Sequence, residues 1–248
     1  MAQYPSSEEI KTAISEVFSE SIGRDPEHLL GSFVPHYFEP MRWICVVPEY
    51  EVQELCDFVN LYKTLDNVAQ GSAQAMTRFR LPIYCHIMEA DFLPTVLWNL
   101  LGAIEGEAPR WPMTRTTRKG ITEECVYPTQ KFDELIERCG RVRLGLGDVL
   151  RELWVPHLRN AFSHSQYLVN TDGSVTRTRE LATIGSVSTP TRYSEGEIDA
   201  LYSGALQYLG SFLNHFKATI AQFKDDTPHR IPTGPIQWDP ERGWWHAI

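Results

Sequence analysis

Apolar side chains recur every three or four positions along most of the chain, the spacing that gathers them on one face of an α-helix. Ser6 and Ser7 stand before the first such stretch and are good helix-start residues. Ser194 and Glu197 have the spacing of a capping box before the last stretch. The pattern predicts helices over residues 8–22, 49–70, 83–104, 129–155, 156–167 and 195–220.

Two of these stretches indicate how the helices pack. Residues 83–104 are apolar nearly all round, which is typical of the central helix of a bundle, and Pro94 should kink or restart that helix. Residues 129–155 show the clearest periodicity in the chain, with a kink expected near Gly145 and Gly147. Pro156 then either kinks this helix or opens a short new one, and the second interpretation is preferred.

The remaining segments predict loops and a little β-structure. Residues 24–40 and 105–128 carry several prolines and are predicted to be loops, while residues 43–47 could form a short strand. A hairpin is expected over residues 168–179, around the dipeptide Asp172–Gly173, because Asp-Gly suits a turn whose two central residues need positive φ. The fold class is therefore mainly α, a helical bundle with a small β-hairpin inserted before the last long helix.

Three regions are predicted along the chain. Residues 1–74 form an N-terminal helical extension, residues 75–224 the core bundle, and residues 225–248 a Pro/Trp-rich C-terminal arm. Because disordered tails rarely concentrate tryptophan, the three tryptophans after residue 237 indicate that the arm docks on its own core or on a second subunit. Truncation after residue 226 should then lower the melting temperature or change the oligomeric mass.

Charge and composition exclude some functions. The chain has 248 residues and a net charge of −9, which argues against a protein that coats nucleic acid or membranes by bulk charge. Residues 138–192 contain eight arginines and four acidic residues, so this segment is +4 and leaves −13 for the rest. The longest apolar run, residues 92–104, is shorter than the roughly 20 residues of a membrane span. The five cysteines lack paired spacing and indicate free thiols in a reducing cytoplasm. No cofactor motif or metal-ligand spacing is present.

The segment Leu158–His164 brings together residues suited to cleaving RNA without a metal ion. The ribose 2′-hydroxyl must lose a proton and attack phosphorus, and the leaving 5′-oxygen must gain a proton. His164 can transfer protons near neutral pH, and Arg159 can stabilise charge on the phosphate. Asn160 can orient the imidazole or bind phosphate.

The spacing also constrains the site. Asn160 and His164 are four residues apart and share a helix face, whereas Arg159 lies about 140° from His164 on a regular helix. Arg159 must therefore reach round, the helix must end near His164, or a second subunit must complete the site. An R-x4-H match is expected about 0.5 times by chance in this composition, but requiring Asn after Arg lowers that to about 0.01.

The sequence Arg159-Asn160-Ala161-Phe162-Ser163-His164 resembles the R-N-x-x-x-H form of the signature of HEPN domains (higher eukaryotes and prokaryotes nucleotide-binding). The resemblance covers about residues 75–224, including a helix pair before the motif and a hairpin and a long helix after it. It implies a helical bundle that forms a homodimer through the motif face. It also implies a metal-independent endoribonuclease of toxin–antitoxin or antiphage systems, with Arg159, Asn160 and His164 as the active-site set.

Some HEPN toxins carry a tyrosine two residues after the histidine, which an antitoxin modifies. Here Gln166 holds that position and Tyr167 follows it, which argues against silencing by tyrosine modification. Tyr167 is kept as a possible supporting residue, with packing as the alternative.

Further residues are candidates for supporting roles. Glu89 and Asp91 fall among apolar neighbours, and because buried carboxylates need partners, one of them is expected to orient Arg159 or His164. The alternative is a carboxylate at a kink near Pro94. Basic residues flanking the motif could follow an RNA backbone, namely Arg151, Arg177 and Arg179. Two other interpretations remain open: a catalytically silent HEPN-like subunit that binds a partner or a nucleotide signal, and a subunit that cuts only in a larger defence assembly.

Overall fold

The computed structural model describes residues 4–24, 26–34, 36–39, 42–45, 48–69, 71–178, 191–225, 227–231, 234–241 and 244–247. The structure is mainly α, as expected. Its α-helices are α1 (Ser7–Ile22), α2 (Pro26–Phe33), α3 (Pro48–Val68), α4 (Ala73–Glu89), α5 (Phe92–Glu105), α6 (Pro128–Val142), α7 (Leu146–Leu153), α8 (Pro156–Ser163) and α9 (Glu195–Ile220).

Short antiparallel strands form small sheets around the helical bundle. They pair as β1–β2, β3–β4, β5–β6–β7 and β8–β9–β10. The strands are β1 (His36–Glu39), β2 (Arg42–Cys45), β3 (Thr114–Thr116), β4 (Thr122–Glu124), β5 (Tyr167–Val169), β6 (Val175–Arg177), β7 (Arg192–Tyr193), β8 (His229–Ile231), β9 (Gly234–Asp239) and β10 (Trp244–Ala247). The β5–β6–β7 sheet precedes α9, where the hairpin was expected, and the predicted strand near residue 43 is β2.

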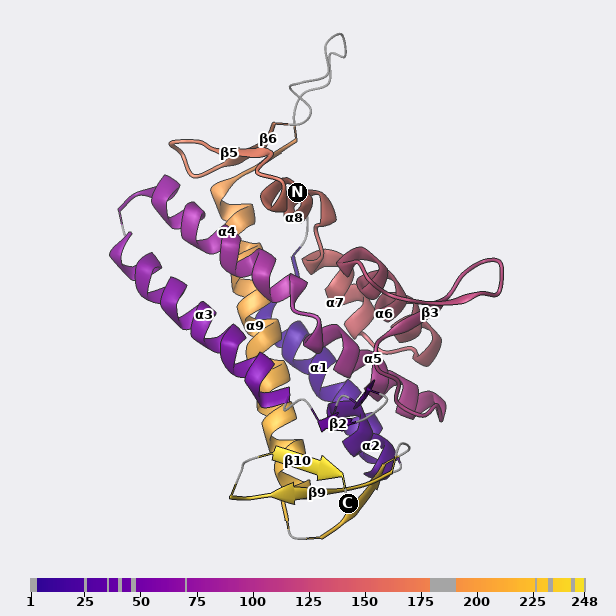
Figure 1. Cartoon of the computed structure of the whole chain (residues 1–248). Helices are drawn as coiled ribbons and strands as arrows, with labels where there is room; N and C mark the ends of the chain where they lie inside the picture. Colours follow the sequence, from indigo (N-terminus) through magenta and orange to yellow (C-terminus); the bar gives the residue numbers. More distant parts are fainter. Residues whose placement is uncertain are drawn as a thin grey trace.

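Helix α9 runs the length of the molecule beside α1 and α4, and α3 packs on the outer side of α4 (Figure 1). The β5–β6 sheet lies at one end of this bundle and the β8–β10 sheet at the other. The capping box of Ser194 and Glu197 starts α9, and Ser6 with Glu9 starts α1 in the same way. Both helix starts were predicted because they depend only on local spacing.

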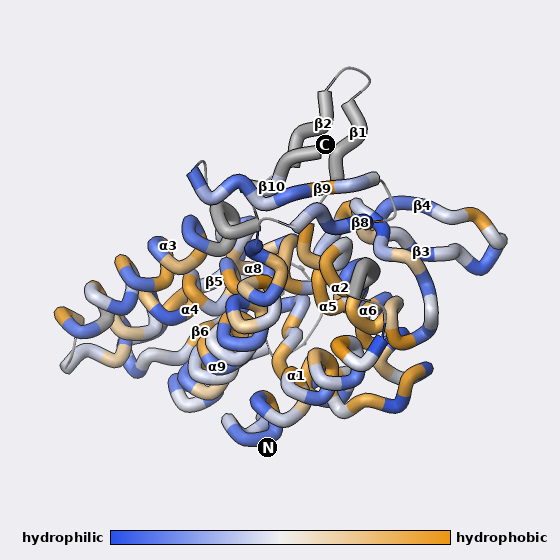
Figure 2. Tube along the Cα trace, turned by 90° about the horizontal axis from the view of Figure 1, so that it is seen from below, coloured by the Kyte–Doolittle hydropathy of each residue, from blue (hydrophilic) through white to orange (hydrophobic). Residues whose placement is uncertain are grey.

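The hydrophobic core includes all three predicted regions. Residues 92–103 of α5 are all buried, as expected of a central helix. Ile14 of α1 and Trp245 of the C-terminal arm belong to the same buried cluster as α5 and α9. The hydrophobic stretches of α2 and α5 lie toward the centre in Figure 2. The C-terminal arm therefore docks on its own core, and residue boundaries at 74 and 225 do not separate independent cores.

Several predicted boundaries were wrong. Residues 24–40 contain α2 and β1, and residues 105–128 contain the β3–β4 hairpin. The stretch 83–104 is two helices that meet at residues 90–91, with Pro94 in the first turn of the second. The stretch 129–155 is also two helices. They are separated where Arg143 adopts a left-handed conformation with φ of 61°, and the second starts after Gly145, where a kink was expected. Apolar periodicity continues across each break because both neighbouring helices bury their apolar faces in one core.

The turn between β5 and β6 also differs from the prediction. The Gly173 N–H donates to the Asn170 carbonyl at 3.0 Å, so Thr171 and Asp172 are the central residues of the turn. Only Gly173 has positive φ there, at 77°, and it forms the bulge that follows the turn. The hairpin connection is therefore longer than the two-residue turn predicted at Asp172–Gly173.

Within the described residues, the segment Ala73–Glu105 is long and apolar enough to cross a membrane by composition alone. Of its most apolar window, 78% is buried inside the protein, which fits a core element of a soluble protein. Cys56, Cys85, Cys125 and Cys139 are free thiols.

Candidate active site

Helix α8 carries the Arg–Asn–His motif, and a buried tyrosine fixes the start of this helix. Pro156 occupies the first turn, where a missing N–H costs nothing. The Tyr84 hydroxyl of α4 donates to the Leu153 carbonyl at 2.8 Å and accepts from the Val155 N–H at 3.0 Å. Leu158 is fully buried and holds one face of α8 on the core. These contacts place the C-terminal half of α8 beside the end of α4.

Glu89, in the last turn of α4, binds the motif directly. Its Oε1 atom accepts from the Arg159 guanidinium Nε and, at 3.0 Å, from the Ser163 hydroxyl. The two charged side chains are 21% and 30% exposed, so the ion pair is largely but not completely shielded from water. Arg159 also donates through a second guanidinium nitrogen to the Asn160 side-chain oxygen at 3.1 Å. One carboxylate oxygen therefore holds the arginine and the residue immediately before His164.

His164 lies just beyond the C-terminal end of α8. Its N–H donates to the Asn160 carbonyl at 3.1 Å, which closes the last turn. Ser165 then takes a left-handed conformation with φ of 54°, and the chain turns into β5. The His164 side chain is exposed. The helix therefore ends near the histidine, which is one of the three arrangements that the spacing allowed.

Tyr167 packs beside the motif. Its ring lies 5.7 Å from that of Phe162, measured between centroids. Burial, followed by the influence of Cys85, raises the pKa of the Tyr167 hydroxyl. Both observations fit the packing role that was the alternative for this residue.

Asp91 lies outside the site, so Glu89 is the one of the two candidate carboxylates that binds Arg159. It occupies the break between α4 and α5 and pairs with Lys131 of α6 at 2.6 Å. Its side chain is 68% exposed. Glu89 and Asp91 diverge because the helix ends between them, so the helical spacing that predicted a common environment does not apply.

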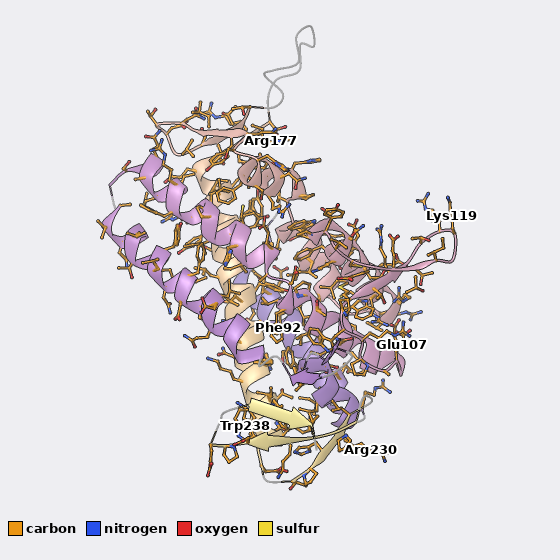
Figure 3. All side chains as sticks on the ribbon, in the orientation of Figure 1. Phe92, Glu107, Lys119, Arg177, Arg230 and Trp238 are labelled. Carbon is orange, nitrogen blue, oxygen red and sulfur yellow. The ribbon has the colours of Figure 1, made fainter. Side chains whose placement is uncertain are left out.

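The flanking basic residues have different surroundings. Arg151 on α7 pairs with Asp148 of the same helix. Arg177 on β6 lies opposite Tyr167 in the β5–β6 register, so it is brought to the motif end of the molecule (Figure 3). Arg179 lies outside the described residues.

The positive charge of the 138–192 segment is partly neutralised in the fold. Among the described residues of this segment, the arginines that pair with carboxylates include Arg138, Arg141, Arg151, Arg159 and Arg192. Arg138 is the most enclosed, at 2% exposure, between Glu105, Glu107 and the ring of Trp98. The segment charge of +4 is therefore larger than the unpaired positive charge that the folded surface presents to RNA.

Sequence reasoning missed Ser163 and Tyr84. Ser163 follows Arg159 by four residues, so helical spacing could have placed both on the face that meets Glu89. Tyr84 gave no comparable signal because its two contacts lie about 70 residues away in the chain.

Within the described part of the chain, no group of three His, Cys, Asp or Glu side chains is arranged to hold a metal ion. Comparison with known proteins found no matching family model, no similar curated protein and no similar solved structure.

Proposed function

We propose that this protein is a metal-independent endoribonuclease of the HEPN type, acting in the cytoplasm in toxin or antiphage defence. The observation that carries the proposal is the cluster at the end of α8. An arginine oriented by Glu89 lies on the short helix α8, and an exposed histidine follows the last residue of that helix. No cofactor is required for the chemistry proposed.

In the proposed reaction the imidazole of His164 removes the proton from the ribose 2′-hydroxyl. The 2′-oxygen attacks the adjacent phosphorus, and the bond to the 5′-oxygen breaks. That oxygen receives a proton from an imidazolium, which leaves a 2′,3′-cyclic phosphate and a 5′-hydroxyl. In a homodimer formed through the motif face, His164 of the second copy supplies the second proton-transfer group.

Arg159 stabilises the charge that builds on the phosphate. Glu89 and Asn160 each take one of its N–H groups, and the others remain for phosphate oxygens. Arginine keeps its charge throughout, and a fixed guanidinium needs little reorganisation when the transition state forms. Glu89 and Ser163 are positioning residues in this scheme because they act through Arg159 and the end of α8.

The test is cleavage of a labelled RNA by purified protein in EDTA. His164→Ala should lower the rate at least about 100-fold, the usual contribution of a general acid or base. His157→Ala is the matched control, since His157 is exposed as well and lies on α8, seven residues before His164. Cleavage that survives His164→Ala would contradict the proposal, as would a loss of equal size in His157→Ala.

The second candidate function is a catalytically silent HEPN-like subunit that binds a partner, such as an antitoxin, or a nucleotide signal in a defence assembly. The ion pair between Glu89 and Arg159 favours it, because a neutralised arginine binds phosphate less readily. An intact dimer that never cuts RNA, alone or with its partner, would support this candidate over the first.

A further inference from the structure

The β3–β4 hairpin projects from the side of the bundle, with Lys119 at its tip (Figures 1 and 3). Its base is anchored, because the Cys125 N–H donates to the Met113 carbonyl at 2.9 Å and both side chains are 1% exposed. The two strands pair from Thr114 opposite Glu124 to Thr116 opposite Thr122. The hairpin is therefore an ordered projection attached to the core.

The tip is a closed turn that carries two cations. The Gly120 N–H donates to the Thr117 carbonyl at 2.8 Å, and the Thr117 N–H donates to the Ile121 carbonyl at 2.8 Å. Gly120 has φ of 77°, the conformation that ends such a turn. Arg118 and Lys119 are the two central residues and are both exposed. The turn thus holds their side chains at the outermost point of the hairpin.

These two cations have no acidic neighbour at the tip itself, although Arg118 also lines the cleft that faces the acidic side of α6. Lower on the hairpin, Arg115 pairs with Glu123 across the strands. Residues 116–122 contain two cations, three threonines and no acidic residue. In the described part of the chain, neither Arg118 nor Lys119 has a carboxylate within ion-pair distance. The tip is therefore a cationic point on a chain whose net charge is −9.

We propose that this tip, residues 116–122, binds the phosphate backbone of single-stranded RNA at a distance from the motif on α8. The inference rests on the proposed function for the choice of RNA as the polyanion. Threonine hydroxyls donate to phosphate oxygens, and the two cations supply the charge. The exposed side chains of Ile121 and Tyr127, 59% and 66% exposed, offer apolar surface to unstacked bases.

The structure also limits the contact. A cleft of 290 Å³ separates the hairpin from α6. Its hairpin wall includes Arg115 and Arg118, and its α6 wall carries Asp133, Glu134 and Glu137. These carboxylates repel phosphate, so the RNA contacts the tip and the outer side of the hairpin and does not enter the cleft. The contact involves a few phosphates and serves to hold the strand.

The experiment measures binding of fluorescein-labelled oligouridylate to the full chain carrying His164→Ala, in EDTA, between 50 and 200 mM salt. Adding Arg118→Ala and Lys119→Ala should weaken binding. It should also reduce the log–log salt slope by about 1.4, since each neutralised phosphate of a single strand contributes about 0.7. The affinity ratio between the two salt concentrations then falls about 7-fold.

The matched control replaces two exposed lysines on helices away from the hairpin by alanine, Lys63 of α3 and Lys217 of α9. A control that changes binding as much as the tip variant overturns the inference, as does a tip variant that binds like its parent. Absence of RNA binding by the parent also overturns it. Binding of polyglutamate that depends on the tip, with RNA binding that does not, assigns the tip to an acidic protein instead and overturns it too.

Binding is measured without cleavage, so this test is separate from the test of the proposed function. If wild-type protein cuts RNA and the tip variant binds normally, only the hairpin inference fails. If the tip controls binding and wild-type protein never cuts, only the endoribonuclease proposal fails.

Discussion

Glu89→Ala is the substitution that most directly tests the geometry of the candidate site. It removes the oxygen that accepts from Arg159 and from Ser163. A hydrogen bond to a charged group contributes about 1.5–3 kcal/mol to stability. An exposed ion pair contributes about 0–1 kcal/mol to stability, whereas breaking a buried one costs about 3–5 kcal/mol. The pair of Arg159 and Glu89 lies between these cases, because its side chains are 21% and 30% exposed. We expect a loss of about 2 kcal/mol, which lowers Tm by about 4–8 °C in a domain of this size.

The assay is a double-mutant cycle on the free energy of unfolding in urea, with Glu89→Ala, Arg159→Ala and the double variant. Because each single substitution already breaks the pair, the double variant should cost less than the sum by about 1 kcal/mol or more. The matched control is Asp91→Ala, which removes an exposed carboxylate two residues away that pairs with Lys131. Its own cost includes leaving Lys131, which is 9% exposed, without this partner, but it should combine additively with Arg159→Ala.

Additivity of Glu89→Ala and Arg159→Ala within about 0.5 kcal/mol would refute the reasoning. Glu89 would then not hold the arginine, and the proposed positioning role would have no energetic basis. Coupling of equal size between Asp91 and Arg159 would refute it as well, because the effect would then be general to this end of α4.

Three further outcomes follow from the structure. Gly173→Ala should lower the unfolding free energy by at least about 1 kcal/mol more than Gly120→Ala does. Both glycines have φ of 77°, but only at Gly173 would an added Cβ lie 3.0 Å from α4. Equal losses in urea titrations would contradict this. Trp245→Ala should cost about 3–5 kcal/mol, since this ring is 2% exposed in the shared core, and an unchanged Tm would show that the arm does not dock. Burial alone would raise the pKa of Glu105, but hydrogen bonds from Arg141 and Arg138 outweigh it and lower that pKa. The stability that Glu105 contributes is therefore present above its unfolded pKa of about 4.3 and is lost as the pH falls through the lower folded value. In Glu105→Gln the unfolding free energy should fall less steeply with decreasing pH below about pH 4.3. An unchanged pH profile of the unfolding free energy would count against this.

Local features of this fold were predictable from the sequence because their causes lie within a few residues. The capping box at Ser194 forms between residues three apart, and Pro156 starts α8 by its own geometry. The two breaks were expected at Pro94 and near Gly145 and Gly147, and they fall slightly earlier, at residues 90–91 and at Arg143. At both breaks the apolar pattern runs on, since the segments on either side bury their faces in the same core.

In the candidate site, too, some features were predictable from the sequence and others depended on the tertiary structure. Spacing together with the Asn that follows Arg singled out Arg159, Asn160 and His164. It left open whether a carboxylate on the preceding apolar stretch would reach them. The structure places Glu89 on Arg159 and Asp91 on Lys131. That choice could not be read from the sequence, because it depends on the helix end that falls between the two acids.

The sequence by itself determined a mainly α chain, the approximate positions of its periodic helical stretches and a short motif suited to proton transfer and phosphate binding. Those properties follow from the order of apolar and polar residues along single helices. Only the tertiary structure decided that α1 and the C-terminal arm share one core with α5 and α9. It also decided that Glu89, 70 residues before Arg159, lies against it. Such contacts depend on how whole helices pack, and packing is set by the combined burial of many distant side chains.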